Sequence, residues 1–192
     1  RKVWSDNAKD EALLGVSLTG IYDSTLTNGT GNRGDLCVLL NTLQEHAVYT
    51  NKSTAKEIGI NQAAAITCVK PSGTVSQLVD SASGIHPRHS PYYVRTVRGD
   101  TKDPMTAFMK DMGIPNEPCF HKPDTTVVFS FPMKAPELAM CDEDITPIKH
   151  LELWKDYQLH WCEHKPSVTV SLKDEDWPSA GAWVWDNFHI LS

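Results

Sequence analysis

The segment of the chain with the clearest chemical potential runs from Cys68 to Ser76 and reads Cys-Val-Lys-Pro-Ser-Gly-Thr-Val-Ser. An apolar run leads into a Pro-Ser-Gly-Thr turn, after which we expect a helix to begin. A helix start presents unpaired backbone N–H groups, and Gly73 lets an anion approach the backbone without a Cβ in the way. Hydroxyl groups at Ser72, Thr74 and Ser76 add donors. These residues predict an anion site built from neutral groups, and the same pattern is also typical of an ordinary helix N-cap.

Two histidines, His160 and His164, are spaced four residues apart, which places them on one face of a helix. This spacing can bind zinc, but a metalloprotease helix has a Glu directly after the first His, and no third ligand is evident. We therefore interpret the pair as a solvated helix face and assign no metal ligand. The run His86–His89 either lies near a substrate or shapes a turn, and we assign it no catalytic role.

The stretch Gly29–Gly34 matches the pattern G-x-G-x-x-G and precedes a predicted helix. A dinucleotide-binding fingerprint follows directly on a strand and has an acidic residue at the end of the next strand. Polar residues separate this stretch from the preceding strand, and no suitable Asp or Glu follows the helix. We interpret it as a flexible loop.

The elements that position these residues alternate between strands and helices. Apolar runs and period-two patterns predict strands at residues 13–19, 63–69, 92–97, 125–131 and 167–172. Helical periodicity predicts helices at residues 35–58, 74–79, 105–112, 151–162 and 182–191. We expect Asp35 to cap the first of these helices, Gly59 to end it, and Pro132 to stop the fourth strand. The alternation indicates an α/β fold with largely parallel pairing, in a single domain over residues 1–192.

Composition narrows the class of protein further. The formal net charge of −6 argues against a surface for duplex nucleic acid. No apolar run reaches bilayer length, and residues from Arg1 to Trp4 do not open an apolar region typical of a signal peptide, so we expect no membrane partner and a cytoplasmic location. Five cysteines without a Cys-x-x-Cys pair indicate reduced thiols. The chain starts without Met and stops inside an apolar stretch, which we interpret as a segment of a larger protein.

Several motifs occur in the order found in one enzyme family. Thr67–Ser76 is followed by Ser83-Gly84-Ile85-His86-Pro87 and then by Tyr92–Arg95. Upstream lies Leu14–Gly20 with its Gly-Val-Ser, and downstream lies Ser167–Ser171. Together these motifs resemble the adenosylcobalamin-dependent (class II) ribonucleotide reductases from about Leu13 to the end of the chain.

This resemblance implies a fold, a reaction and a site. The family fold is a ten-stranded α/β barrel, of which this chain would be the C-terminal portion. The reaction replaces the 2′-hydroxyl of a ribonucleoside di- or triphosphate by hydrogen and supplies deoxyribonucleotides for DNA replication. It is started by a thiyl radical that adenosylcobalamin generates. By position, the substrate-phosphate-binding residues are Pro71, Ser72, Gly73, Thr74, Val75 and Ser76.

The chain also departs from the family. The finger-loop pattern Asn-x-Cys-x-Glu is absent, as are the N-terminal half-barrel with its reducible cysteine and the thiol-bearing tail. We therefore assign no catalytic residue, interpret Cys68 as a core residue, and expect the chain alone to be inactive without the N-terminal half as its partner. Two alternatives stay open: a nucleotide-binding subunit of a split reductase, and a metal-binding protein organised by His160 and His164.

Overall fold

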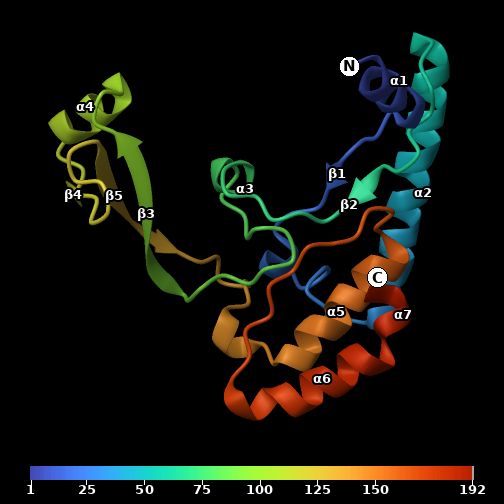
Figure 1. Cartoon of the computed structure of the whole chain (residues 1–192). Coiled ribbons are helices and arrows are strands. Elements are labelled where there is room, and N and C mark those ends of the chain that lie inside the picture. Colours follow the sequence, from blue (N-terminus) through green and yellow to red (C-terminus); the bar gives the residue numbers. More distant parts are fainter. Residues whose placement is uncertain (192) are drawn as a thin grey trace. The chain divides into compact units, whose positions relative to one another are not determined.

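The computed structural model describes residues 1–191, and the chain divides into two compact units (Figure 1). The first unit combines residues 1–88 with the chain from Leu138 onward, and the second is His89–Glu137. The first unit contains α1 (Lys2–Glu11), β1 (Val16–Ser17), η1 (Ile21–Asp23), α2 (Arg33–Ile58), β2 (Thr67–Cys68), α3 (Val75–Leu78), η2 (Asp142–Asp144), α5 (Pro147–His160), η3 (Asp174–Asp176), α6 (Trp177–Asp186) and α7 (Phe188–Leu191). The second contains β3 (Tyr92–Asp100), α4 (Pro104–Asp111), β4 (Asn116–Pro118) and β5 (Thr126–Lys134).

The long helix α2 begins two residues earlier than its sequence pattern predicts. Asn32, not Asp35, is the N-cap, and its side-chain oxygen accepts a hydrogen bond from the N–H of Gly34 at 2.8 Å. Asp35 lies in the first turn, where a negative charge is favoured by the helix dipole. Gly59 ends the helix in the left-handed conformation at φ 74°, which confirms the prediction at that end.

Helix α5 is the centre of the hydrophobic core of the first unit and packs against both α2 and α6 (Figure 1). It starts at Pro147, earlier than predicted, because Thr146 caps it and proline fits the first helical position. The buried apolar side chains of this core are Ile21, Tyr22, Leu36, Leu40, Val69, Ile85, Leu151, Leu153, Trp154, Tyr157, Trp161, Cys162, Ala180 and Trp183.

The strands of the first unit are shorter than the apolar runs suggest. β1 and β2 pair in parallel, with Val16 opposite Thr67 and Ser17 opposite Cys68. The predicted strand at residues 167–172 is wrong, since none is assigned there. The chain nevertheless runs beside β2, because the N–H groups of His164 and Ser167 donate to the carbonyls of Thr67 and Val69 at 3.0 Å. Pro166 has no N–H to donate, so a regular ladder cannot form at this point.

The second unit is a three-stranded antiparallel sheet in the order β3-β5-β4, so the expectation of largely parallel pairing is wrong for it. Pro132 does not stop β5, which continues to Lys134 with Pro132 opposite Val94. β4 pairs with β5 only from Val127 to Phe129. At Pro132 the strand therefore has a neighbour on one side only, where proline is tolerated.

Helix α4 lies close to β3 because β3 carries a glycine at the contact. A Cβ built on Gly99 would lie 2.4 Å from the hydroxyl oxygen of Thr106, which is buried in α4. Asp103 caps the helix by accepting a hydrogen bond from the N–H of Met105 at 2.9 Å. Sequence reasoning placed this helix correctly to within one residue.

None of the helices in the described part of the chain is long and apolar enough to cross a membrane.

Candidate functional site

The candidate site lies where the parallel pair β1–β2 ends. The N–H of Val16 donates to the carbonyl of Ile66 at 2.8 Å, and the N–H of Leu18 to that of Cys68 at 3.3 Å. Because the two strands are parallel, their carboxyl ends release two loops at the same edge of the sheet. One loop starts at Thr19, and the other is the predicted phosphate loop, which starts at Lys70.

The turn of the phosphate loop is closed by its own serines. The hydroxyl of Ser72 accepts a hydrogen bond from the N–H of Ser76 at 3.1 Å, and the hydroxyl of Ser76 donates back to the carbonyl of Ser72 at 2.6 Å. The N–H of Ser72 donates to the hydroxyl of Ser83 at 2.7 Å. α3 starts at Val75, three residues beyond Ser72 and later than expected, and it has only four residues. Its dipole is therefore small, and the donors of the loop itself matter more.

Five donors of this loop have no hydrogen-bond partner among residues 1–191. They are the backbone N–H groups of Gly73, Thr74 and Val75, and the hydroxyl groups of Ser72 and Thr74. Ser72 is half-buried, whereas residues 73–75 and Pro71 are exposed. A Cβ added at Gly73 would meet no atom within 4 Å, so the chain itself does not require glycine there. The serine hydroxyls thus build the turn, and the donors that remain accessible are those of residues 73–75.

A buried arginine fixes the far end of this loop. Arg88, whose side chain is 3% exposed, donates from Nε and Nη2 to the two carboxylate oxygens of Asp23, each at 3.0 Å. It also reaches the side chain of Asp80 at 3.2 Å and its carbonyl at 2.7 Å. Asp23 in turn accepts a hydrogen bond from the N–H of Ala82 at 2.6 Å. Sequence reasoning missed this ion pair, because no local pattern links positions 65 residues apart.

The segment after the loop is held against β1 and β2 by short contacts. The hydroxyl of Thr19 donates to the carbonyl of Ala82 at 2.8 Å and accepts from the N–H of Gly84 at 3.1 Å. Gly84 has φ 55°, and a Cβ there would lie 3.0 Å from the carbonyl oxygen of Lys70. Both its conformation and its close approach require glycine.

The two histidines behind the loop have structural partners. Nδ1 of His86 lies 3.1 Å from the carbonyl of Ser83 and donates to it, while Nε2 accepts from the N–H of Thr169 at 2.9 Å. His150 donates from Nε2 to the carbonyl of Ile85 at 2.8 Å, and burial lowers the pKa of His150. Of the two roles considered for the run His86–His89, the structure therefore supports shaping the turn.

The histidine pair of the sequence pattern does not come together. Nδ1 of His160 lies 3.2 Å from the side-chain oxygen of Asn41, whereas Nε2 of His164 donates to the carbonyl of Leu14 at 2.8 Å. His164 lies beyond the end of α5, which stops at His160. The metal-binding alternative built on these two residues therefore has no support.

All five cysteines are free in the structure. Cys68 is buried in β2, as predicted for a core residue, and burial raises the pKa of the nearby Cys162 thiol to about 12. Both side chains are buried, whereas redox chemistry needs an accessible sulfur.

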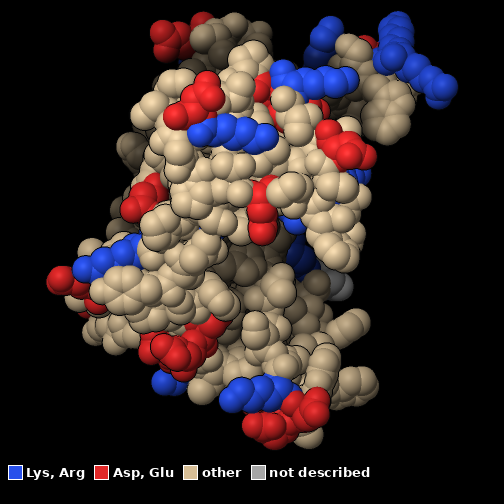
Figure 2. Space-filling view, turned by 90° about the vertical axis from the view of Figure 1, so that its left-hand side faces the viewer, with Lys and Arg blue, Asp and Glu red and all other residues tan. Residues whose placement is uncertain are grey.

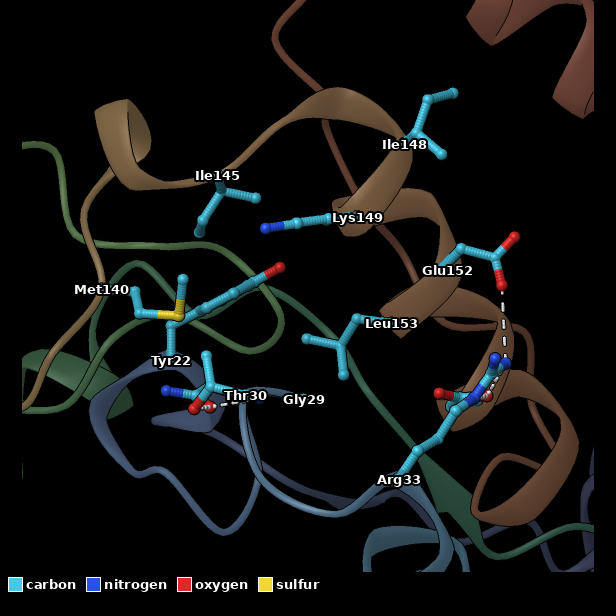
Figure 3. Close-up of a pocket in the computed structure, with 12 residues that line it drawn as sticks. Tyr22, Gly29, Thr30, Arg33, Met140, Ile145, Ile148, Lys149, Glu152 and Leu153 are labelled. Carbon is cyan, nitrogen blue, oxygen red and sulfur yellow. Dashed lines mark hydrogen bonds and ion pairs between the residues drawn. The ribbon is translucent and has the colours of Figure 1, made fainter.

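A cavity of about 500 Å³ lies between η1, the start of α2 and the helix α5 (Figure 3). Its apolar wall includes Met140, Ile145 and Leu153. At its other end Arg33 forms ion pairs with Glu152 at 3.4 Å and with Asp156 at 2.6 Å. The stretch Gly29–Gly34 contributes Gly29 and Thr30 to this lining and follows the 3₁₀ turn η1, not a strand.

Figure 2 shows one face, on which charged side chains of both signs are scattered among uncharged ones.

No protein-family model matches the chain. The chain is 33% identical over 116 residues to the adenosylcobalamin-dependent ribonucleoside-triphosphate reductase of Euglena gracilis, covering 60% of this chain and 16% of that protein. It is 30% identical over 176 residues to the probable enzyme of the same name from Dictyostelium discoideum, covering 88% of this chain and 22% of the relative. The Lactobacillus gasseri enzyme is 25% identical and aligns with 92% of this chain.

A comparison with solved structures also finds a class II ribonucleotide reductase fold. A crystal structure of a B12-dependent (class II) ribonucleotide reductase matches 95% of this chain and 29% of its own length, with a TM-score of 0.79 and 20% identity. The chain spans about a quarter or less of the curated relatives it matches. With relatives along most of its length and a matching mixed α/β fold, the chain belongs to the family of adenosylcobalamin-dependent (class II) ribonucleotide reductases.

Proposed function

We propose that this chain is the substrate-holding segment of a ribonucleotide reductase, and that residues 71–76 bind the phosphates of the ribonucleotide. One observation carries the proposal: the N–H groups of Gly73, Thr74 and Val75 and the Thr74 hydroxyl are exposed and have no partner in the described chain, in a loop whose turn is closed by Ser72 and Ser76. Donors to a charged group contribute about 1.5–3 kcal/mol each. A few such donors suffice for a substrate anchor.

Within the loop, two sets of residues have different proposed roles. Ser72 and Ser76 maintain the turn through their mutual hydrogen bonds, while residues 73–75 face the phosphate. Pro71 has no N–H and contributes only its fixed backbone angle. Gly73 leaves space above the backbone for phosphate oxygens.

The reaction of the complete enzyme replaces the 2′-hydroxyl of the substrate by hydrogen, and adenosylcobalamin supplies the radical that starts it. The cavity of about 500 Å³ near Arg33 has the volume of a small-molecule site, and Arg33 is paired there with Glu152 and Asp156. It does not fit a corrin ring with its nucleotide tail. We therefore assign no residue of this chain to the cofactor. The proposed function of the chain is to bind and orient the substrate.

The remaining part of the barrel is the partner that we propose for this chain. β1 pairs with β2 on one side and has no strand on its other side among the described residues. Leu13, Leu14 and Val16 are about half exposed at this edge. An exposed strand edge with apolar side chains is a site for pairing with a further strand. We propose that the N-terminal half-barrel, on the same polypeptide or on a separate subunit, supplies that strand.

Two substitutions test the phosphate loop by equilibrium binding of a ribonucleoside triphosphate. Thr74→Val removes one hydroxyl donor and should weaken binding at least ten-fold, as expected from about 1.5–3 kcal/mol. Gly73→Ala places a methyl group where the phosphate approaches, and should weaken binding without lowering stability, since the space is open and φ is not positive. Thr54→Val, at an exposed position of α2, is the matched control.

Unchanged affinity of both loop variants would contradict the proposed role of the loop. A separate assay addresses the chemistry: the purified chain with adenosylcobalamin, a dithiol and a ribonucleotide should form no deoxyribonucleotide. Product formed by the chain alone would require one of its cysteines to carry the radical, with Cys68 and Cys119 the first to replace by Ala.

A further inference from the structure

Three side chains with metal-binding atoms meet where α2 packs against α5. Cys37 lies in the second turn of α2, and Asp156 and His160 are spaced four residues apart on α5. The thiol sulfur, a carboxylate oxygen and an imidazole nitrogen all lie within 4.8 Å of one another. Residues four apart share a helix face, so α5 presents both of its ligands to α2.

Neighbouring side chains orient two of these three groups. The side-chain oxygen of Asn41, one turn after Cys37, lies 3.2 Å from Nδ1 of His160. An amide oxygen only accepts, so Nδ1 carries the proton and Nε2 keeps its lone pair. Metal-binding histidines commonly donate their other ring N–H to an oxygen in this way. This hydrogen bond leaves Nε2 as the nitrogen of His160 that can bind a metal.

Asp156 is oriented in the same manner. Arg33 donates from both Nε, at 3.0 Å, and Nη2, at 2.6 Å, to a single oxygen, Oδ1. The second oxygen, Oδ2, has no hydrogen bond within the described chain. The residue is 5% exposed, so most of its side chain lies within the helix interface.

Charge also favours a cation here. Asp156 and Glu152 each carry a negative charge and Arg33 one positive charge, which leaves the cluster with a net charge of minus one. A divalent cation bound with a Cys37 thiolate adds a net charge of plus one. The occupied cluster is therefore neutral.

We propose that Cys37, Asp156 and His160 form a binding site for Zn²⁺. Sulfur, nitrogen and carboxylate oxygen suit zinc and disfavour magnesium or calcium, which prefer oxygen alone. In a tetrahedral zinc site the ligand atoms are roughly 3–4 Å apart. Side-chain rotations that move the three ligand atoms by about an ångström would therefore complete the site. Three protein ligands leave a fourth position open. Asp156 and Arg33 also line the cavity in Figure 3, so the metal lies beside that cavity.

The site differs from the zinc pair that the sequence pattern offers. It uses His160 but not His164, whose Nε2 is bonded to Leu14. It is also independent of the phosphate loop, because neither α2 nor α5 contributes residues 71–76. Failure of the metal proposal therefore leaves the proposed function intact, and the reverse holds too.

Titration of the chelator-treated chain with Co²⁺, followed by competition with Zn²⁺, tests this proposal. A thiolate ligand gives cobalt an intense near-ultraviolet charge-transfer band, which we expect at one equivalent of metal and which Zn²⁺ should abolish. Cys37→Ser should remove the band, and His160→Gln should weaken binding at least ten-fold. Asn41→Ala, which removes the orienting oxygen, should weaken it by about 10- to 100-fold.

His164→Gln is the matched control, because it removes a histidine close in sequence without touching the cluster. It should leave the affinity and the band unchanged. Circular dichroism of each variant separates loss of metal from loss of fold, and Cys37→Ser is the decisive variant because the side chain is only half-buried. Absence of a band, or a band that persists in Cys37→Ser, overturns the proposal. Loss of binding in His164→Gln also overturns it, in favour of adventitious binding by histidine.

Discussion

The ion pair of the buried Arg88 with Asp23 should contribute more to stability than the pairs that Arg33 forms with Glu152 and Asp156, and Arg88→Gln tests this. Glutamine keeps a polar side chain but removes the charge and most of the donors. The Asp23 carboxylate, whose side chain is only 15% exposed, then keeps its charge without a cation. Removing one partner of a buried ion pair typically costs about 3–5 kcal/mol.

The geometry places the loss at Arg88→Gln toward the upper part of this range. Both carboxylate oxygens of Asp23 lose a donor, and the carbonyl of Asp80 loses its bond at 2.7 Å. Since domains are stable by about 5–15 kcal/mol, the loss is a large fraction of the total. By contrast, Asp80→Asn breaks a contact to a side chain that is 66% exposed, and should cost less than about 1 kcal/mol.

Urea unfolding followed by tryptophan fluorescence measures both changes, with the m-value checking that the two-state assumption holds. We expect a much lower midpoint for Arg88→Gln and a nearly unchanged one for Asp80→Asn. The double variant with Asp23→Asn should recover part of the loss, because the uncompensated charge is then gone. If Arg88→Gln costs no more than Asp80→Asn, the assignment of Arg88 as the residue that anchors residues 80–88 is wrong.

Two further predictions concern a buried histidine and a close helix contact. Burial lowers the pKa of His150 below 6.5. The contribution of the neutral His150 to stability is therefore complete above pH 6.5 and is lost as the pH falls through the pKa of His150 in the folded state. Urea midpoints at pH 7 and pH 5 should then differ less in His150→Gln than in the parent chain. Gly99→Ala should destabilise the second unit by about 1–3 kcal/mol, because its Cβ would lie 2.4 Å from the Thr106 hydroxyl; amide hydrogen exchange in β3 and β5 that matches the parent chain would contradict this.

Features that depend on neighbours in sequence could be predicted well. The end of α2 at Gly59 and the position of α4 follow from local capping and glycine conformation. The candidate phosphate loop could be proposed from the sequence because its residues are contiguous, and its role stays a prediction. The exact cap of α2 was missed because Asn32 and Asp35 are both good N-cap residues, and only the structure shows which side chain meets an N–H.

Strand lengths could not be predicted, because an apolar run does not specify its pairing partners. Residues 63–69 are apolar and mostly buried, yet only Thr67 and Cys68 form a ladder with β1. Similarly, the alternating residues 167–172 need a neighbour with a regular ladder, and Pro166 interrupts the one beside β2. Pairing depends on residues far away in the chain, or on strands outside it.

The partners of the charged groups around the candidate site could not be predicted from the sequence for the same reason. Their arrangement bears on the anion binding that we propose for the loop. Arg88 is occupied by Asp23 and Asp80. Lys70, directly before the loop, donates to the carbonyl of Lys165 at 2.8 Å and to the hydroxyl of Ser167 at 3.1 Å. Both cations thus hold the scaffold in place, and the exposed donors left to the proposed phosphate are the neutral N–H and hydroxyl groups of residues 73–75. An anion site of the kind that we propose would select by the direction of its hydrogen bonds more than by net charge, which would suit a loop that places a ribose as well as attracting a phosphate.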